Sequence, residues 1–301
     1  MSDFSADRTS GSGDVARAFL DAFERFAAVD TSTSAPALRA ALLAWLRAAQ
    51  AAQPSMALIH QLAARALETA DAATAREDSV AAARQSLARS CAAERSDLDA
   101  TRAAIARVAV GLLTEPNAWN ATLSLSGAVR EALLAAHRSG LRPRVLVAES
   151  RPLMEGRELA AALAAAGIPV WLTVDAVLPL LTSEARTVWI GADAVTDRGV
   201  INKVGSYALA LAAREHSVPM YALAGRRKFL PASTAALKIV EMPPEEVWDR
   251  PASGARPRNL YFELVPLELL RGIVVEDGVL GPSEAATVAR ERPLPEELAG
   301  A

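Results

Sequence analysis

Hydrophobic residues in the first third of the chain recur at the spacing of amphipathic helices. Val15, Phe19, Phe23 and Phe26 follow one another at intervals of three or four residues, which places them on one face of a helix. Residues 35–52 and 54–70 are also helical in pattern, and Pro54-Ser55 marks a helix start between them. A longer stretch, from about 75 to 113, has no proline and one glycine, and it predicts a long amphipathic helix.

These stretches predict a helical domain over residues 14–115. The Ser/Gly/Asp-rich residues 1–13 that precede it are expected to be disordered. Cys91, the one cysteine of the chain, falls on the apolar face of the long helix. A thiol in that position is more often a packed core residue than a nucleophile, so we expect Cys91 to be buried.

The hydrophobic pattern changes at Pro116 and Asn117, which end the helix. Beyond them, short runs rich in β-branched residues alternate with Ala/Leu-rich runs of helical length, which is the pattern of βαβ units and of an α/β fold. Because each expected strand is mostly apolar, we expect a parallel sheet covered on both faces. This domain would span 116–289, with a mobile tail at 290–301 and strands at 121–125, 144–149, 170–175, 187–191 and 218–224.

Polar side chains follow these strands at the points where the strands end. The carboxyl ends of parallel strands share one edge of the sheet, and ligands of open α/β sheets bind at that edge. Cations and helix N-termini at the edge would bind an anion. The candidate residues are Ser124, Ser126, Gly127, Arg151, Gly156, Asp193, Asn202, Lys203 and Lys228.

Asp193 and the pair Asn202-Lys203, which is expected to open the next helix, allow two interpretations. Asp193 could accept hydrogen bonds from sugar hydroxyls or move a proton. Alternatively, Asp193 and Asn202 only cap helices and stabilise turns. Because five strand ends all carry polar groups, the sequence favours a pocket for a phosphorylated polyol.

Composition and charge argue against several other classes of protein. The formal net charge is −3 and no long basic stretch occurs, which argues against a nucleic-acid partner. One cysteine and three scattered histidines form no metal-binding spacing, so we expect no metal and no cofactor. The polar N-terminus has no apolar signal core, and no apolar run approaches the ~18 residues of a membrane span. We therefore expect a cytoplasmic protein without membrane contact.

Three motifs carry a family resemblance: ESRP-x3-G at 149–156, GAD at 191–193 and NK at 202–203. In this order they resemble the superfamily that joins the alpha, beta and delta subunits of translation initiation factor 2B with two sugar-phosphate isomerases. Those enzymes isomerise methylthioribose 1-phosphate and ribose 1,5-bisphosphate. The resemblance spans roughly 54–286 and implies a helical domain, a Rossmann-like domain and a homodimer or larger homo-oligomer.

The resemblance also implies catalytic positions, and the chain departs from them. The isomerases use a cysteine after the first strand, here Ser124, and the aspartate of GAD, here Asp193. A serine hydroxyl is a far weaker acid than a thiol, and the Arg-Gly-Ala stretch with which the isomerases bind phosphate is missing. The sequence therefore favours a non-catalytic, initiation-factor-2B-like protein that binds a sugar phosphate or nucleotide and acts through assembly or a partner. The alternative is an aldose-1-phosphate to ketose isomerase that uses Asp193 and Ser124.

Overall fold

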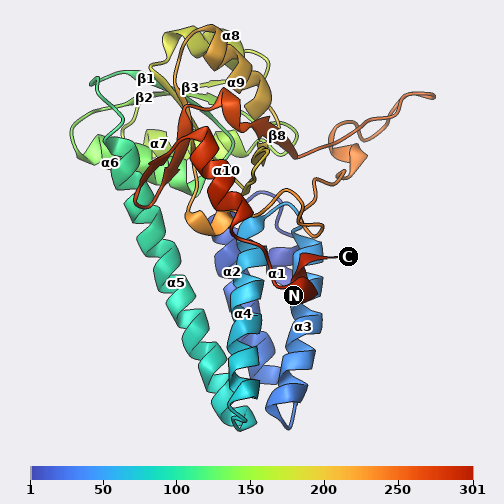
Figure 1. Ribbon diagram of the computed structural model, residues 1–301. Helices are drawn as coiled ribbons and strands as arrows, with labels where there is room; N and C mark the ends of the chain where they lie inside the picture. The colour runs from blue at the N-terminus through green and yellow to red at the C-terminus, as the bar shows by residue number, and fades with distance from the viewer. Residues whose placement is uncertain (1, 301) are drawn as a thin grey trace.

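The computed structural model describes residues 2–300, and in it four long helices form a bundle that leads into a sheet domain (Figure 1). Ser34 and Ser79 begin two of these helices by accepting hydrogen bonds from the backbone N–H groups of Ala37 and Ala82, which satisfies amides that lack a helical partner. All four expected helices are confirmed. They are α2 (Ser12–Val29), α3 (Ala35–Ala52), α4 (Ala57–Ala75) and α5 (Val80–Val110).

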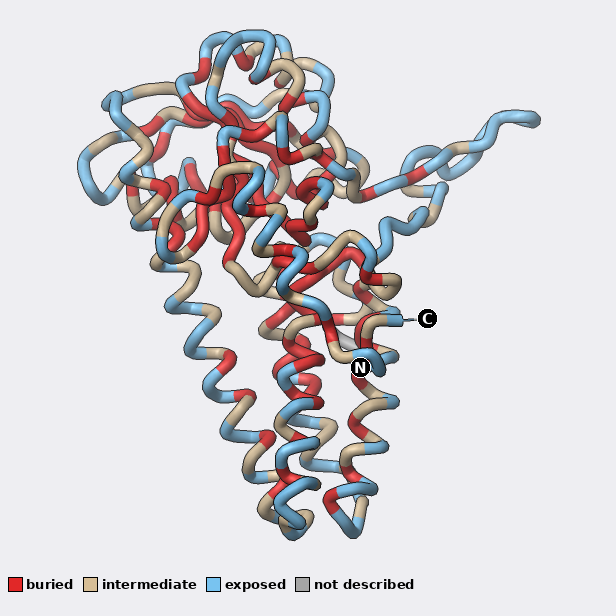
Figure 2. The backbone as a smooth tube through the Cα atoms, in the orientation of Figure 1, coloured by how far each residue is buried: buried red, intermediate tan, exposed pale blue. Residues whose placement is uncertain are grey.

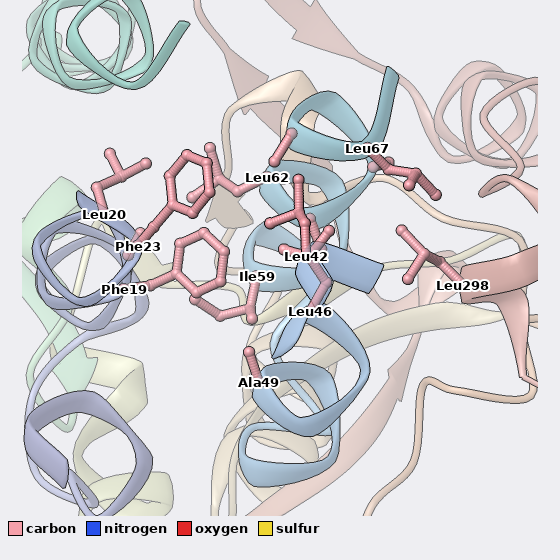
Figure 3. Packing of buried hydrophobic residues seen from close by; sticks show 14 of the residues in the cluster. Phe19, Leu20, Phe23, Leu42, Leu46, Ala49, Ile59, Leu62, Leu67 and Leu298 are labelled. Atoms are coloured by element: carbon pink, nitrogen blue, oxygen red, sulfur yellow. The ribbon is translucent and has the colours of Figure 1, made fainter. Parts of the chain in front are cut away.

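Aromatic and aliphatic side chains fill the interior of the bundle. The rings of Phe19 and Phe23 lie 5.3 and 5.9 Å, between centroids, from the ring of Trp45. Figure 3 shows the two phenylalanines beside Leu46 and Ile59. Burying each side chain of this size contributes roughly 1.5–3 kcal/mol, so the apolar stripes that predict the helices also hold them together.

The N-terminal segment packs onto the bundle. The short helix α1 (Ser2–Ser5) carries Phe4, which is fully buried and meets the ring of Phe19 edge-on at 5.6 Å. Gln53 donates hydrogen bonds to the carbonyls of Phe4 and Asp7. This packing corrects the expected disorder of residues 1–13, because one aromatic side chain in a polar segment is enough to attach it to the core; Met1 lies outside the described residues.

The C-terminal segment packs in the same way. Helix α11 (Glu296–Ala299) buries Leu298 in the core of the bundle, and Glu297 pairs with Arg39 of α3. The expected mobile tail at 290–301 is therefore corrected for residues up to 300. Ala301 lies outside the described residues.

The rest of the chain folds around a seven-stranded sheet in the order β10-β9-β7-β4-β1-β2-β3. Within the described chain β10 pairs antiparallel and the other strands pair parallel. The five strands expected from the sequence are β1, β2, β3, β4 and β7, and the expected α/β fold with an N-terminal helical region is confirmed. The strands are β1 (Trp119–Leu123), β2 (Arg144–Ala148), β3 (Val170–Thr173), β4 (Thr187–Ile190), β7 (Met220–Leu223), β9 (Gly272–Val275) and β10 (Gly278–Leu280).

Helices cover both faces of the sheet, which explains why its strands are apolar. The end of α5, α6 (Gly127–Arg138) and α7 (Glu155–Ala165) pack on one face. The other face carries α8 (Leu178–Leu181), α9 (Ser206–Glu215) and α10 (Pro282–Arg290). Since α5 contributes to the core of the bundle and to the sheet domain, a domain boundary near residue 115 stays a prediction.

The strand order creates a crevice beside β1. The chain runs from β1 to β2 and β3 on one side, then returns to β4 on the other side of β1. Connections that leave neighbouring strands in opposite directions open a crevice at their carboxyl ends, and ligands bind there. The loops after β1 and β4 are therefore the expected walls of a site.

A second, antiparallel sheet of β5 (Ala194–Val195), β6 (Gly199–Lys203) and β8 (Phe262–Pro266) lies beside this crevice. Asn202 and Lys203 end β6, which corrects the expectation that they open a helix. The chain after 260 forms the three strands β8, β9 and β10. The segment 249–259 projects from the body in Figure 2 and is exposed over most of its length.

Candidate functional site

A cavity of about 610 Å³ lies at the crevice, between the sheet and the bundle. Its walls come from the loops after β1 and β4, the end of β6, the start of α2 and about two turns of α5. Seven of the nine candidate residues from the sequence line it. They are Ser124, Ser126, Gly127, Asp193, Asn202, Lys203 and Lys228.

Asp193 lies where the chain leaves β4. Its backbone N–H donates to the carbonyl of Ile201 at 2.8 Å, and its own carbonyl accepts from Ala57 at 2.9 Å, so β6 and α4 hold the residue in place. Burial raises the pKa of the Asp193 carboxyl to about 6, although Lys228, Lys203 and a hydrogen bond from Ser12 oppose that rise. A carboxyl with a pKa this close to neutrality can both accept and return a proton.

Lys228, in the 3-10 helix Arg226–Lys228, is held by two uncharged acceptors. Its Nζ donates to Ser12 Oγ at 2.8 Å and to the carbonyl of Ala192 at 2.6 Å. Burial lowers the pKa of Lys228, and the neighbouring Asp193 acts in the opposite direction. Because neither hydrogen-bond acceptor is charged, the ammonium can still attract an anion in the cavity.

Lys203 instead forms a buried ion pair. Its Nζ lies 2.6 Å from Glu155 Oε1, and each of the two side chains is 5% exposed. The same ammonium lies 4.6 Å from the centroid of the Tyr261 ring. Glu155 Oε2 has no hydrogen-bond partner in the described part of the chain. Since Glu155 compensates its charge, Lys203 offers little free positive charge to a phosphate.

Asn202 and Ser126 line the cavity and also stabilise the ends of helices. Asn202 Nδ2 donates to Ser206 Oγ at 2.8 Å, at the start of α9, and the Ser126 hydroxyl accepts from the backbone of Val129 to cap α6. Gly191 lies between them, because a Cβ at that position would approach Ser126 Oγ to 2.7 Å and Asn202 Oδ1 to 3.4 Å. The glycine of the GAD motif thus allows the loops after β1 and β4 to meet.

Ser124 has the left-handed backbone conformation, with φ of 59°, and its N–H donates to Ser150 Oγ at 2.7 Å. No histidine is among the residues that line the cavity over the described range 2–300. Cys91 is buried in the bundle as expected, with its thiol donating to the carbonyl of Leu20, and burial raises the pKa of that thiol to about 12. Cys91 also lies outside the cavity lining, so it does not replace the missing thiol.

Arg151 and Gly156, the other two candidates, do not line the cavity. The Arg151 side chain is exposed, and its backbone N–H donates to Asp175 at 2.8 Å. Gly156 has a packing role, because a Cβ there would lie 1.9 Å from the carbonyl oxygen of Ala148. A strand end brings a loop to the rim of the sheet, but which way each side chain then points depends on local packing.

The cavity contains functional candidates that the sequence analysis did not identify, namely Ser12, Arg102, Glu155 and Tyr261. Glu155 stands inside the ESRP-x3-G stretch, which could have drawn attention to it. Arg102 is one of many arginines on a long helix, and Ser12 falls in the segment expected to be disordered. No local pattern distinguishes either of them.

Residues 2–300 also contain neither a metal-binding cluster nor a membrane-spanning helix. No cluster of three or more His, Cys, Asp or Glu side chains there could hold a metal ion. Nor does that part of the chain contain a helix with the length and apolar character needed to cross a membrane.

The model of the Initiation factor 2 subunit family matches residues 8–282. The chain belongs to this family. Its resemblance to both the initiation-factor proteins and the isomerases is thereby confirmed, because the similar proteins include both kinds.

Among curated relatives of this family member, a putative translation initiation factor eIF-2B subunit 2-like protein of Pyrococcus furiosus is 39% identical over 163 residues, 54% of this chain and 57% of the relative. A ribose 1,5-bisphosphate isomerase of Archaeoglobus fulgidus is 34% identical over 175 residues, 56% of this chain and 55% of the relative. A methylthioribose-1-phosphate isomerase of Synechococcus sp. is 36% identical over 177 residues, 55% and 52% of the two chains. The chain thus spans little more than half the length of these relatives.

Solved structures extend the similarity to nearly the whole chain. The translation initiation factor eIF-2B of Pyrococcus horikoshii superposes with a TM-score of 0.80 at 26% identity, over 93% of this chain and 94% of that chain. A 5-methylthioribose 1-phosphate isomerase from the same species has a TM-score of 0.67 at 18% identity, over 94% and 83% of the two chains, and it shows the shared fold alone. Initiation-factor proteins and isomerases therefore share this architecture.

Proposed function

We propose that this member of the initiation factor 2 subunit family binds a phosphorylated sugar or a nucleotide in the cavity and acts through assembly or a partner, without catalysis. The observation that carries the proposal is the composition of the cavity: it gathers Asp193, Asn202 and Lys228 around a volume suited to a small ligand, while Ser124 stands where the isomerases have a thiol. Hydroxyl groups of a sugar suit the carboxylate and amide, and a phosphate suits the cations.

An isomerase is the second candidate, and Asp193 favours it. Its pKa of about 6 suits a group that moves a proton between the first two carbons of an open-chain sugar phosphate. In that case the Ser124 hydroxyl would act at the position of the thiol. A hydroxyl needs a neighbouring base to act in this way, and no histidine lines the cavity over residues 2–300. We therefore prefer the binding function to the isomerase.

Phosphorus NMR separates the two functions. The protein is incubated with ribose 1,5-bisphosphate, methylthioribose 1-phosphate, ribose 5-phosphate and a nucleoside monophosphate. We expect broadening or shifts of at least one ligand resonance and no new resonances from a ketose. Appearance of the ketose would establish the isomerase in place of the binding protein. If no compound of the panel binds or reacts at millimolar concentration, the proposal is wrong.

A further inference from the structure

Arg102 of α5 reaches the cavity between the starts of two helices. Gly13 lies in the first turn of α2, and Gly127 is the first residue of α6. A Cβ on Gly13 would lie 3.0 Å from Nη2 of Arg102, and a Cβ on Gly127 would lie 3.5 Å from Cζ. Because neither glycine has a side chain, the guanidinium of Arg102 has room between the start of α2 and the start of α6.

Positive charge accumulates at this end of the cavity. Each helix N-terminus carries a partial charge of roughly +0.5, and the guanidinium and the ammonium of Lys228 add two full charges. Asp14, 3.3 Å from Arg102, is shared with Arg17, which lies 3.0 Å from the same carboxylate. Burial lowers the pKa of Lys228, and the charge of Arg102 lowers it further, so like charges at one end of the cavity are unfavourable unless an anion compensates them.

The other cations of the cavity are compensated more fully. Lys203 has its own buried carboxylate in Glu155. Arg227 pairs with both Glu94 and Asp97.

Arg8 also lines the cavity, and its Nη1 contacts Met242 Sδ, but its side chain is exposed to solvent. Among the less exposed cations, Arg102 and Lys228 are therefore the least compensated. Arg102 shares Asp14 with Arg17, and the main charged neighbour of Lys228 is Asp193.

We propose that Arg102 binds the phosphate of the ligand, in the gap between the starts of α2 and α6. This inference rests on the proposed function and specifies it: the ligand is a phosphate ester whose phosphate lies at Arg102 and whose hydroxyl groups lie toward Asp193 and Asn202. The planar guanidinium donates two parallel hydrogen bonds to phosphate oxygens, which a lysine cannot do. The amides at the two helix starts provide further donors.

Binding measurements on matched variants test this role. Dissociation constants for ribose 5-phosphate, methylthioribose 1-phosphate and inorganic phosphate are measured calorimetrically for the wild type, Arg102→Gln, Arg102→Lys and Arg107→Gln. Arg107 is an exposed arginine on the same helix and lies outside the cavity lining. We expect Arg102→Gln to weaken binding about 10- to 100-fold, since a hydrogen bond to a charged group is lost. Arg102→Lys should lose less, and Arg107→Gln should bind as the wild type does.

The possible outcomes separate this inference from the proposed function. If the wild type binds a phosphate ester and Arg102→Gln binds it equally well, Arg102 is not the phosphate residue, while the proposed function stands. If the wild type binds neither these probes nor any compound of the phosphorus NMR panel, the proposed function fails and the inference fails with it. Should Arg102→Gln not fold, Arg102→Lys replaces it, because the lysine keeps the charge but cannot donate two parallel hydrogen bonds to a phosphate. Unchanged affinity of Arg102→Lys for a phosphate ester would then overturn the inference.

Discussion

Asp193 illustrates, at the scale of a single residue, how burial decides the chemistry of a side chain. The carboxyl stands at the end of a strand, and the three groups that favour its charged form, Lys228, Lys203 and Ser12, do not outweigh its loss of water. Its pKa of about 6 in the folded protein exceeds the value of about 3.9 in an unfolded chain. The folded state therefore binds the proton more tightly than the unfolded state does.

This difference predicts how stability depends on pH. The contribution of Asp193 is fully present below pH 4 and is lost as the pH rises through 6, and its size is about 3 kcal/mol. Measured by urea unfolding, the free energy of unfolding of the wild type should fall by this amount between pH 4 and pH 7, relative to that of Asp193→Asn. The control Asp249→Asn removes an exposed carboxylate. Its free energy of unfolding should fall between pH 4 and pH 7 as that of the wild type does. Parallel curves for the wild type and Asp193→Asn would contradict the raised pKa.

At the scale of secondary-structure elements, close approach between α7 and β2 depends on one glycine. Gly156 lies at the second position of α7 and faces the carbonyl of Ala148, the last residue of β2. Since a Cβ there would overlap with backbone atoms that cannot rotate away, α7 has to move off the sheet to accept any side chain. The glycine of ESRP-x3-G thus has a packing role at this contact.

Substitution of Gly156 by alanine tests this role. We expect Gly156→Ala to lower the free energy of unfolding by about 3 kcal/mol, because overpacking typically costs about 1–3 kcal/mol and a Cβ only 1.9 Å from a backbone oxygen lies at the upper end of that range. The control Gly281→Ala, where an added Cβ meets no atom within 4 Å, should cost at most about 1 kcal/mol, through the N-cap of α10. If Gly156→Ala and Gly281→Ala lowered the free energy of unfolding equally, the contact with Ala148 would not limit how closely α7 packs on the sheet.

At the scale of the whole molecule, apolar side chains remain exposed beyond the cavity. Trp171 and Val174, at the edge strand β3 and just after it, are 51% and 52% exposed, and Leu180 of α8 is 73% exposed. Exposed apolar side chains that gather on one part of a surface often mark a contact with another protein.

We therefore expect a homo-oligomer, with the homodimer as the smallest form. Sedimentation equilibrium at micromolar concentration should yield a mass of at least twice that of one chain. Addition of detergent below its critical micelle concentration should shift the equilibrium toward the monomer if apolar side chains form the contact. A monomer at all concentrations up to about 100 μM, which is weaker association than about −5.5 kcal/mol, would show that the chain does not assemble with itself.

The amino-acid sequence by itself determined the elements of this protein and the edge at which its site forms. The apolar stripe from Val15 to Phe26 and the runs at β1, β2, β4 and β7 are local patterns, and a local pattern is sufficient to define a helix or a buried strand. The order of parallel strands then places Asp193 and Ser124 at one edge. Phe4 shows the limit of composition, because a single aromatic residue overrides a polar segment.

Only the tertiary structure decided which charges in the cavity are free. Lys203 pairs with Glu155 across 48 positions of the chain, and Lys228 meets Ser12 across 216. The first contact depends on how β6 lies beside the start of α7, and the second on how the helical bundle packs against the sheet domain. Neither periodicity nor motif spacing encodes these arrangements. The same packing turns Arg151 toward solvent and brings Arg102 between two helix ends. Electrostatic compensation is a property of neighbours in space, so it is decided only when the elements have packed.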